Sequence, residues 1–368
     1  MRLTTLTIPL ATTALLLALA PAAHAAAAST CTVNGTAQTG TVINGTAGND
    51  IITCWAGSRD ETSILPGTTV NGLGGDDMIS ASGSPAVDGA TVNGGDGDDS
   101  ITLRGAASAT GALAVRSSQI NGGTDHDNIL IYGGDATAGA DSRVNAAVAG
   151  GGVDAGPGND NVSILGGVAT NAGGLGGHGV LAGTVAGQDG DDTVTVGGGR
   201  ATGALGRGGD GLLSGASTTG GAGDDMITVG GGTGEGAVGS GNLSTVTGEA
   251  GVDVIYGGNG DGEILGGDGN DRLFGGLGAD TVDGGDGDDL LCGDRGKHDT
   301  TACLSTVEQG DGDDIIRGGD GADSIDGQGH TTNPPGDTAD GGPPAAPAGG
   351  VDPDTCTRTE TTTGCRVI

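Results

Sequence analysis

Apolar and polar residues alternate in many short segments of the chain, and this period-2 pattern predicts short β-strands. Ile101 with Leu103, and Ile227 with Val229, are examples of such alternating pairs. A Gly-rich stretch precedes each segment, and an aliphatic residue such as Val92 usually stands two positions before that stretch. Two straight segments therefore flank each Gly-rich turn. Before residue 248, Ala-Thr pairs such as 136–137 mark a third straight piece in several units.

The Gly-rich stretches and the strands after them form one recurring nonapeptide, G-G-x-G-x-D-x-(aliphatic)-x. We count 14 copies, in which the eighth position is always aliphatic and the sixth is Asp in 13 copies, with Gly262 as the exception. The fourth position is Gly in 13 copies, with Asp125 as the exception. The copies start at residues 45, 72, 94, 122, 155, 187, 220, 248, 257, 266, 275, 284, 309 and 318. A repeat this regular indicates a repetitive architecture.

The spacing of the copies predicts a solenoid. Before residue 248 the copies are 22 to 33 residues apart, whereas five copies follow one another without a gap from 248 to 292. Each long unit provides one coil, and two tandem nonapeptides provide one coil of 18 residues. Stacked at the strand spacing of about 4.8 Å, the coils form an all-β, right-handed parallel β-helix/β-roll solenoid. Its open ends need caps, because exposed strand edges promote aggregation.

The two ends of the chain differ from the repeats. Residues 1–25 combine Arg2, an apolar run and the A-x-A sequence Ala23-His24-Ala25, which is typical of a cleaved secretory signal peptide. The expected regions after it are an N-terminal cap and first repeat (26–66), a long-repeat parallel β-helix (67–247), a nonapeptide β-roll (248–327) with a disulfide-stapled insertion at 293–308, and a Pro/Gly-rich linker with a C-terminal disulfide loop (328–368).

Six cysteines fit an exported protein in an oxidising compartment. They occur as three pairs that are close in sequence, and their spacing matches no zinc-binding pattern. Among the 15 possible connectivities we expect the short-range one, which joins Cys31 to Cys54, Cys292 to Cys303 and Cys356 to Cys365.

Composition and charge exclude several classes of protein. The chain has 85 Gly but only four aromatic residues, Trp55, Tyr132, Tyr256 and Phe274, so it lacks the large side chains of an ordinary globular enzyme core. The net charge of −34 argues against nucleic acid and anionic membranes as partners. No later segment is apolar enough to span a membrane. Either a disordered acidic chain or a repeat protein neutralised by cations fits this composition.

The recurrence of Asp at the sixth position of the repeat points to metal binding. Stacking would place one carboxylate about every 4.8 Å along an edge, and such a row repels itself unless cations neutralise it. Gly residues allow positive φ, so that the turns can direct carbonyl oxygens toward the same place. Carboxylate and carbonyl oxygens are the ligands that Ca²⁺ prefers, and folding would then be coupled to calcium. The alternative is a solvated acidic edge without metal.

The nonapeptide resembles the RTX calcium-binding repeat, most specifically from Gly248 to Cys292. The resemblance implies a parallel β-roll in which calcium lies between stacked turns, held by the sixth-position Asp and by turn carbonyls. In the long units, stacking would join consecutive copies instead of alternate ones. The implied calcium ligands are Asp50, Asp77, Asp99, Asp127, Asp160, Asp192, Asp225, Asp253, Asp271, Asp280, Asp289, Asp314 and Asp323.

Motifs for catalysis are scarce. The sequence has no H-E-x-x-H, no G-K-[ST] and no G-x-S-x-G between a strand and a helix. The sharpest candidate is Asp125-His126-Asp127 near Tyr132, which resembles the acid-His-acid cluster of β-helix alginate epimerases. We therefore expect a secreted, calcium-stabilised structural or adhesive module without catalysis, whose partner is calcium and a cell-surface or matrix polysaccharide or protein. The alternatives are a polysaccharide-active lyase or epimerase and, from Thr193-Val194-Thr195, an ice-binding protein.

Overall fold

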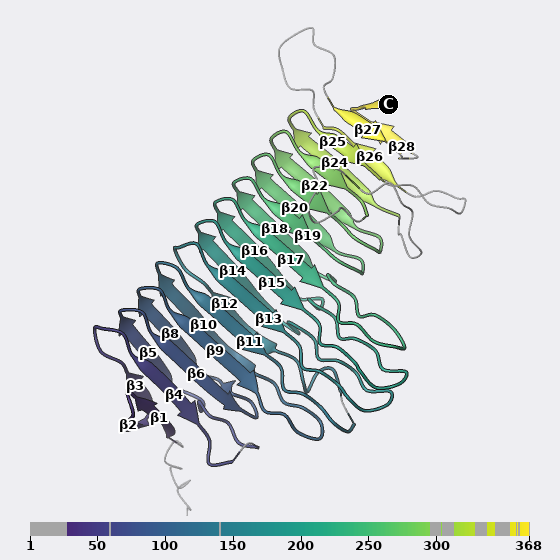
Figure 1. The fold of residues 1–368 in the computed structure, drawn as a ribbon. Coiled ribbons are helices and arrows are strands. Elements are labelled where there is room, and N and C mark those ends of the chain that lie inside the picture. The colour runs from purple at the N-terminus through teal and green to yellow at the C-terminus, as the bar shows by residue number, and fades with distance from the viewer. Residues whose placement is uncertain are drawn as a thin grey trace, which may run out of the picture.

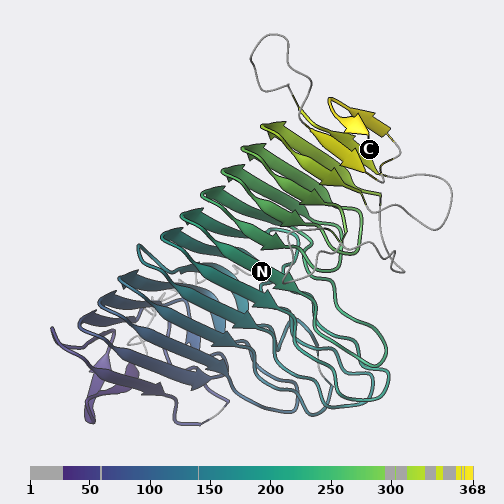
Figure 2. The ribbon, with the colours of Figure 1, turned by 45° about the horizontal axis from the view of Figure 1, so that its top comes forward.

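The computed structural model describes residues 28–58, 60–139, 141–294, 303, 313–327, 337–342, 354–357, 359 and 361–367. The predicted signal peptide, most of the insertion at 293–308 and the first residues of the copy at 309 lie outside this range. The described chain is an elongated stack of coils that builds two long sheets (Figures 1 and 2). Within these ranges there is no helix with the length and apolar character needed to cross a membrane.

Most strands of the first sheet follow the sixth-position Asp of a long unit or of every other copy in the tandem block, whereas the strands after Asp280 and Asp314 belong to the second sheet. Neighbouring strands are parallel, except where β1 pairs with β2 and with β4. In spatial order its 15 strands are β2 (Thr36–Gly40), β1 (Ser29–Val33), β4 (Ile51–Trp55), β6 (Met78–Gly83), β9 (Ser100–Gly105), β11 (Asn128–Tyr132), β13 (Asn161–Leu165), β15 (Thr193–Gly197), β17 (Met226–Gly230), β19 (Val254–Tyr256), β21 (Arg272–Phe274), β23 (Leu290–Cys292), β25 (Ser324–Asp326), β27 (Thr355–Thr357) and β29 (Arg366–Val367).

The second sheet contains the strands that lead into the turns, and all its pairings are parallel. In spatial order they are β28 (Thr361–Thr363), β26 (Thr338–Asp340), β24 (Ile315–Asp320), β22 (Thr281–Asp286), β20 (Glu263–Asp268), β18 (Thr245–Ala250), β16 (Ala216–Ala222), β14 (Gly183–Asp189), β12 (Val148–Asp154), β10 (Val115–Thr124), β8 (Thr91–Asp96), β5 (Thr69–Gly74) and β3 (Val42–Asn44), with β7 (Val87–Asp88) pairing beside β10. This arrangement confirms the predicted all-β parallel β-helix/β-roll.

The interior is built from columns of aliphatic residues that face each other from the two sheets. Eighth-position residues such as Ile101 and Val194 point inward from the first sheet, and residues such as Val92 and Val185 face them from the second. Thr218 stands in the second column where its neighbours have Val, and it is also buried. Equivalent buried residues of successive coils therefore lie next to each other, and their packing keeps consecutive coils in register.

Disulfides and an antiparallel hairpin accompany the two ends of the solenoid. Cys31 of β1 lies opposite Cys54 of β4, and the two are disulfide-bonded. Bonds also join Cys292 to Cys303 and Cys356 to Cys365, so all three predicted pairings are confirmed. The β1–β2 hairpin pairs antiparallel with the first coil and so ends the parallel stack at the N-terminal side.

The third straight piece of the long units is less regular than the sequence pattern indicates. Single parallel bridges connect Ser108, Ala136, Ala169, Ala201 and Gly234 in successive coils, but no continuous strand forms among them. The flanking Gly residues lack side chains that would pack, so this side of each coil is a loop with isolated bridges. These loops form the wide side of the rod in Figure 1.

The solenoid continues beyond residue 328, where the sequence analysis predicts a linker. Strands β26 and β27 extend the two sheets, and β28 and β29 follow them. Gly341 lies against the Asp354 carboxylate, in the same way as the first-position Gly lies against the sixth-position Asp in the other repeats. These two positions are 13 residues apart in sequence, whereas the first and sixth positions of a regular copy are five apart, and this hides the period.

Candidate metal centre

The sixth-position aspartates form one continuous ladder along an edge of the solenoid. In each step the main-chain N–H of one Asp donates to Oδ1 of the Asp in the next coil, over 2.6–3.0 Å. Consecutive copies stack in the long units and alternate copies in the tandem block, as the sequence predicts. The members are Asp50, Asp77, Asp99, Asp127, Asp160, Asp192, Asp225, Asp253, Asp271, Asp289, Asp323 and Asp354.

A second, shorter ladder begins at Gly262, among the copies that alternate with the first. The N–H of Gly262 donates to Asp280 Oδ1 over 2.8 Å, and Asp280 and Asp314 donate in turn to Asp314 and Asp337. Gly262 starts this ladder and so donates only through its main chain, which explains why the repeat can lack Asp there. Asp337 and Asp354 were missed in the sequence. The signal was an Asp two residues before a small apolar residue, Ala339 or Cys356.

The second oxygen of most of these carboxylates is buried and has no hydrogen-bond partner. A carboxylate oxygen in this state is costly because it has lost its water without replacing it. The oxygens concerned are Oδ2 of Asp77, Asp99, Asp127, Asp160, Asp192, Asp225, Asp253, Asp271, Asp280, Asp289 and Asp314. Each of these buried oxygens needs a positively charged partner, and a row of bound cations would supply one at every step.

Burial raises the pKa of these carboxyl groups, because it disfavours the charged form. The donated N–H lowers the pKa in part, and neighbouring carboxylates raise it further at several positions. The pKa is raised at Asp77 and Asp271, to about 6 at Asp99, Asp160 and Asp253, to about 7 at Asp127, Asp192, Asp225, Asp280 and Asp289, and to about 9 at Asp314.

The first Gly of each repeat leaves room beside the unpartnered oxygen. A Cβ on Gly266 would overlap Asp271 Oδ2 and the carbonyl oxygen of Gly284 in the next coil, and the same pair of oxygens borders the equivalent Gly in most coils. A carboxylate oxygen and a main-chain carbonyl therefore face one gap between coils. In the part of the chain that the structure describes, no three His, Cys, Asp or Glu side chains converge on a metal site. The donors available at this gap are oxygens, which suit a hard cation such as Ca²⁺.

Backbone strain shows that the stack imposes the turn. Gly267 and Gly269 take φ values of 124° and 147°, which L side chains rarely adopt. Asp125, which replaces the fourth-position Gly, keeps a positive φ of 78°. Glu249 does the same at a second position, with φ 88°. The turn is therefore maintained even where the sequence departs from Gly.

Asp50, at the N-terminal end of the ladder, differs from the other predicted ligands. Its Oδ2 accepts the Thr46 N–H over 2.5 Å and the Thr46 hydroxyl over 3.0 Å, and its Oδ1 accepts the Asn34 amide over 2.5 Å. Thr46 occupies a position that is Gly in many other copies. Hydrogen bonds thus satisfy both oxygens in the first coil.

The Asp125-His126-Asp127 cluster does not converge with Tyr132. His126 Nδ1 accepts the N–H of Asn159 over 2.9 Å, and the His126 N–H donates to Asp98 Oδ1 over 3.0 Å, so His126 is hydrogen-bonded to the fifth-position residues of the two adjacent coils. Tyr132 lies at the opposite end of β11, about 20 Å from His126 by the rise of an extended strand. The acid-His-acid-Tyr arrangement expected of an epimerase is therefore not assembled.

Replacing Gly266 by Ala is expected to weaken calcium binding and to lower the melting temperature of the calcium-loaded protein. The new methyl group would occupy the gap between Asp271 Oδ2 and the Gly284 carbonyl oxygen. Gly230→Ala is the matched control, because a Cβ there meets no atom within 4 Å. Calorimetric calcium titration and thermal melts of both variants test this. Equal calcium affinity in the two variants would contradict the placement of the site.

Comparison with known families agrees with this geometry. The family model described as the RTX calcium-binding nonapeptide repeat matches four segments of the chain, residues 40–58, 238–264, 265–297 and 309–330. A search of curated proteins finds no match. The matched segments cover the first coil and much of the chain from residue 238 to residue 330, and the same Asp ladder continues through the coils between residues 59 and 237 that the family model does not match.

Proposed function

The chain is an RTX-type calcium-binding repeat protein, and we propose that it is a secreted, non-catalytic module that folds on calcium and has a structural or adhesive role outside the cell. The observation that carries the proposal is that Oδ2 of eleven sixth-position aspartates between Asp77 and Asp314 is buried without a hydrogen-bond partner. Calcium, when bound, supplies the positive charge that these oxygens lack. The residues that would hold it are the sixth-position aspartates from Asp77 onward, together with the first-position carbonyls of adjacent coils.

Secretion is supported by the features of residues 1–25 and by the cysteines. An apolar run that ends in an A-x-A site is typical of exported proteins. All six cysteines form disulfides, which persist in oxidising compartments. Extracellular calcium concentrations would then favour folding after export instead of before it.

Calcium titration of the mature chain tests the proposal. Adding Ca²⁺ to chelator-treated protein is expected to change its far-UV circular dichroism cooperatively from coil to β, because each coil can stack only when the neighbouring carboxylates are neutralised. Magnesium is the control, since it prefers near-ideal octahedral geometry and keeps its waters. A spectrum that is fully β-rich in excess chelator at neutral pH would overturn calcium-coupled folding.

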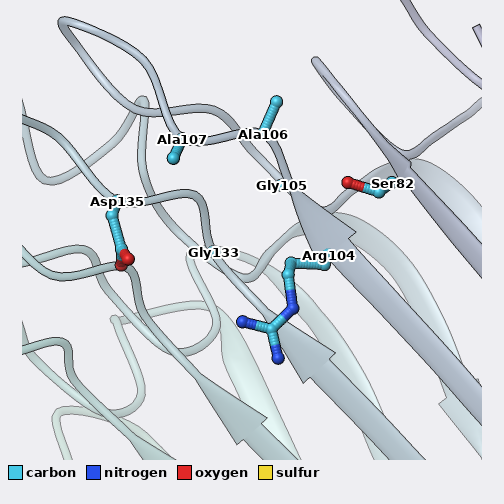
Figure 3. A pocket seen from close by; sticks show the side chains of 7 residues that line it. All are labelled: Ser82, Arg104, Gly105, Ala106, Ala107, Gly133 and Asp135. Atoms are coloured by element: carbon cyan, nitrogen blue, oxygen red, sulfur yellow. The ribbon is translucent and has the colours of Figure 1, made fainter. Parts of the chain in front are cut away.

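A polysaccharide-active enzyme is the second candidate function. A hollow of about 240 Å³ that is lined by Arg104 and Asp135 favours this function (Figure 3). The Tyr132 ring contacts Arg104. Against it stands the separation of His126 from Tyr132. Release of unsaturated or epimerised sugars from alginate or another glycan by the calcium-loaded protein would establish catalysis and overturn the non-catalytic proposal.

A further inference from the structure

The outward side of the first sheet differs from the rest of this acidic molecule. Its ten strands from β4 to β23 contain neither Asp nor Glu, although the chain has 47 such residues. Their outward positions hold mainly Thr, Ser, Asn and apolar side chains, and the only charged ones are Arg104 and Arg272. We call this surface the neutral face. By contrast, strands of the second sheet include Asp154, Glu263 and Asp283.

Three of the four aromatic residues of the chain lie on the neutral face, and the fourth is buried next to one of them. Trp55 in β4, Tyr132 in β11 and Tyr256 in β19 occupy outward positions of their strands, whereas Phe274 in β21, which is in register with Tyr256, is buried. The three come from regions far apart in the sequence, and only strand alternation places them on one side. Aromatic rings gathered on a surface of an otherwise aromatic-poor protein indicate a binding surface.

The aromatic residues are arranged along the axis of the solenoid. Trp55, Ser82, Arg104 and Tyr132 are direct neighbours in successive strands, so the two rings lie three strand spacings apart, about 14 Å. Trp55 is 43% exposed. Farther along, Tyr256 and Phe274 stack with ring centroids 4.9 Å apart and an interplanar angle of 7°.

Hollows accompany these rings where the first sheet passes into the loops. Trp55 lines one of about 450 Å³, and Tyr256 with Phe274 lines another of about 620 Å³. The hollow of about 240 Å³ is lined by polar side chains of three coils, Ser82, Arg104 and Asp135, and otherwise by Gly and Ala residues (Figure 3).

Arg104 is held in place with its hydrogen-bond donors unused. Its guanidinium lies 4.6 Å from the centre of the Tyr132 ring, which is a cation–π contact. Among the described residues it has no hydrogen bond or ion pair. Asp135 uses Oδ1 to accept the Val168 N–H over 2.9 Å. The hollow thus offers a fixed donor group and a carboxylate acceptor beside an aromatic ring.

From these features we propose that the neutral face binds a linear polysaccharide that runs along the solenoid axis. Sugar rings present C–H groups on their faces, which the negative face of an aromatic ring attracts, and hydroxyl groups at their edges, which Arg104, Asp135 and Ser82 can bind. The strands from β4 to β23 carry no acidic side chain, and the carboxylates at their edge, Asp60 and Glu61 beside Trp55 and Asp135 beside Arg104, can accept hydroxyl groups of a glycan. Arg104 offers a positive charge to a uronate. The proposal names the partner of the adhesive role proposed above and rests on calcium-dependent folding only because the face exists in the folded protein.

Binding of the calcium-loaded full chain to a panel of glycans tests the proposal. The panel contains insoluble neutral β-glucan, chitin and the polyuronate alginate, with retention measured in pull-downs and affinity electrophoresis. Wild-type protein is expected to bind at least one glycan, and Trp55→Ala with Tyr132→Ala is expected to weaken binding at least about tenfold. Stronger binding to β-glucan and chitin would assign neutral sugars, and preference for alginate would assign uronates through Arg104.

A pair of Asp substitutions provides the matched control. Thr102 and Thr91 lie in the same coil but face outward from opposite sheets. Thr102→Asp places a carboxylate between Ser80 and Leu130 on the neutral face and is expected to reduce glycan binding. Thr91→Asp is expected to leave it unchanged. Circular dichroism with calcium must show that all variants fold, which separates failure of this proposal from failure of calcium-coupled folding.

Several results would overturn the assignment. Folded wild-type protein that binds no glycan of the panel would do so, as would equal binding by the Trp55/Tyr132 double variant. Equal loss of binding in Thr91→Asp and Thr102→Asp would show a general charge effect. Calcium-dependent self-association that Thr102→Asp abolishes, without glycan binding, would assign the neutral face to a second copy of the chain.

Discussion

Replacing Asp192 by Asn is expected to have opposite effects with and without calcium. The Asn side chain keeps an oxygen to accept the Asp160 N–H, now 2.7 Å from Asp192 Oδ1. It also replaces the unpartnered Oδ2 by an NH₂ group that faces the carbonyl oxygen of Gly220. In chelator the substitution removes a buried charge, so residual β structure should increase. At saturating calcium it removes a charged ligand, so the melting temperature should fall.

The variant Asp192→Ala separates the two roles of the same carboxylate. Alanine leaves the buried Asp160 N–H without an acceptor, which costs about 1–3 kcal/mol in either condition. Asp192→Ala should therefore be less stable than Asp192→Asn both with and without calcium, because both variants lose the charge and only alanine also loses the acceptor. Chemical denaturation in calcium and in chelator measures both variants. A lower stability of Asp192→Asn in chelator would show that Oδ2 is not an uncompensated charge.

Asp50→Asn serves as the control at the end of the ladder. Hydrogen bonds already satisfy both oxygens of Asp50, so this carboxylate should respond least to calcium. Its substitution is expected to change the calcium midpoint less than Asp192→Asn does. An equal shift for both variants would indicate that calcium acts on the chain through net charge and not through particular coils.

Lowering the pH is expected to stabilise the metal-free protein and to destabilise the calcium-loaded one. Burial raises the folded-state pKa of Asp127, Asp192 and Asp225 to about 7, from 3.8. The folded state therefore binds more protons than the unfolded state between these values. The stabilisation is complete below pH 3.8 and is lost as the pH rises through about 7. Metal-free protein should thus gain β structure between pH 8 and pH 5.

Calcium reverses this dependence, because the cation needs the deprotonated carboxylates. At fixed calcium concentration, stability should fall as protons compete for the ladder below about pH 7. Circular dichroism melts across the pH range, with calcium and with chelator, should give curves that cross. Concentrated sodium chloride is the control, since salt screens exposed charges but not burial. Curves of the same slope would contradict a shared site for protons and calcium.

Local regularity made much of this molecule readable from its sequence. Coils contact mainly their neighbours in a solenoid, so a period along the chain becomes a period in space. The parallel sheets, the stacking of consecutive aspartates from Asp77 to Asp253 and the short-range cysteine pairs all follow from that relation. Even Gly262 can be understood from the sequence position it occupies, once it is placed at the start of the second ladder.

Features that depend on how the folded coils are arranged could not be predicted from the period of the sequence. Asp337 and Asp354 continue the ladders, but the sequence before each of them departs from the nine-residue period. The position of the neighbouring coil determines that Oδ1 of a ladder Asp accepts a hydrogen bond while Oδ2 of most of them has no partner. The sequence shows only that aromatic residues are scarce, and scarcity argues against sugar binding. The structure places Trp55, Tyr132 and Tyr256 on one side of a sheet whose strands from β4 to β23 contain no acidic residue, because alternation along a strand becomes a side of the molecule only when the strands are aligned.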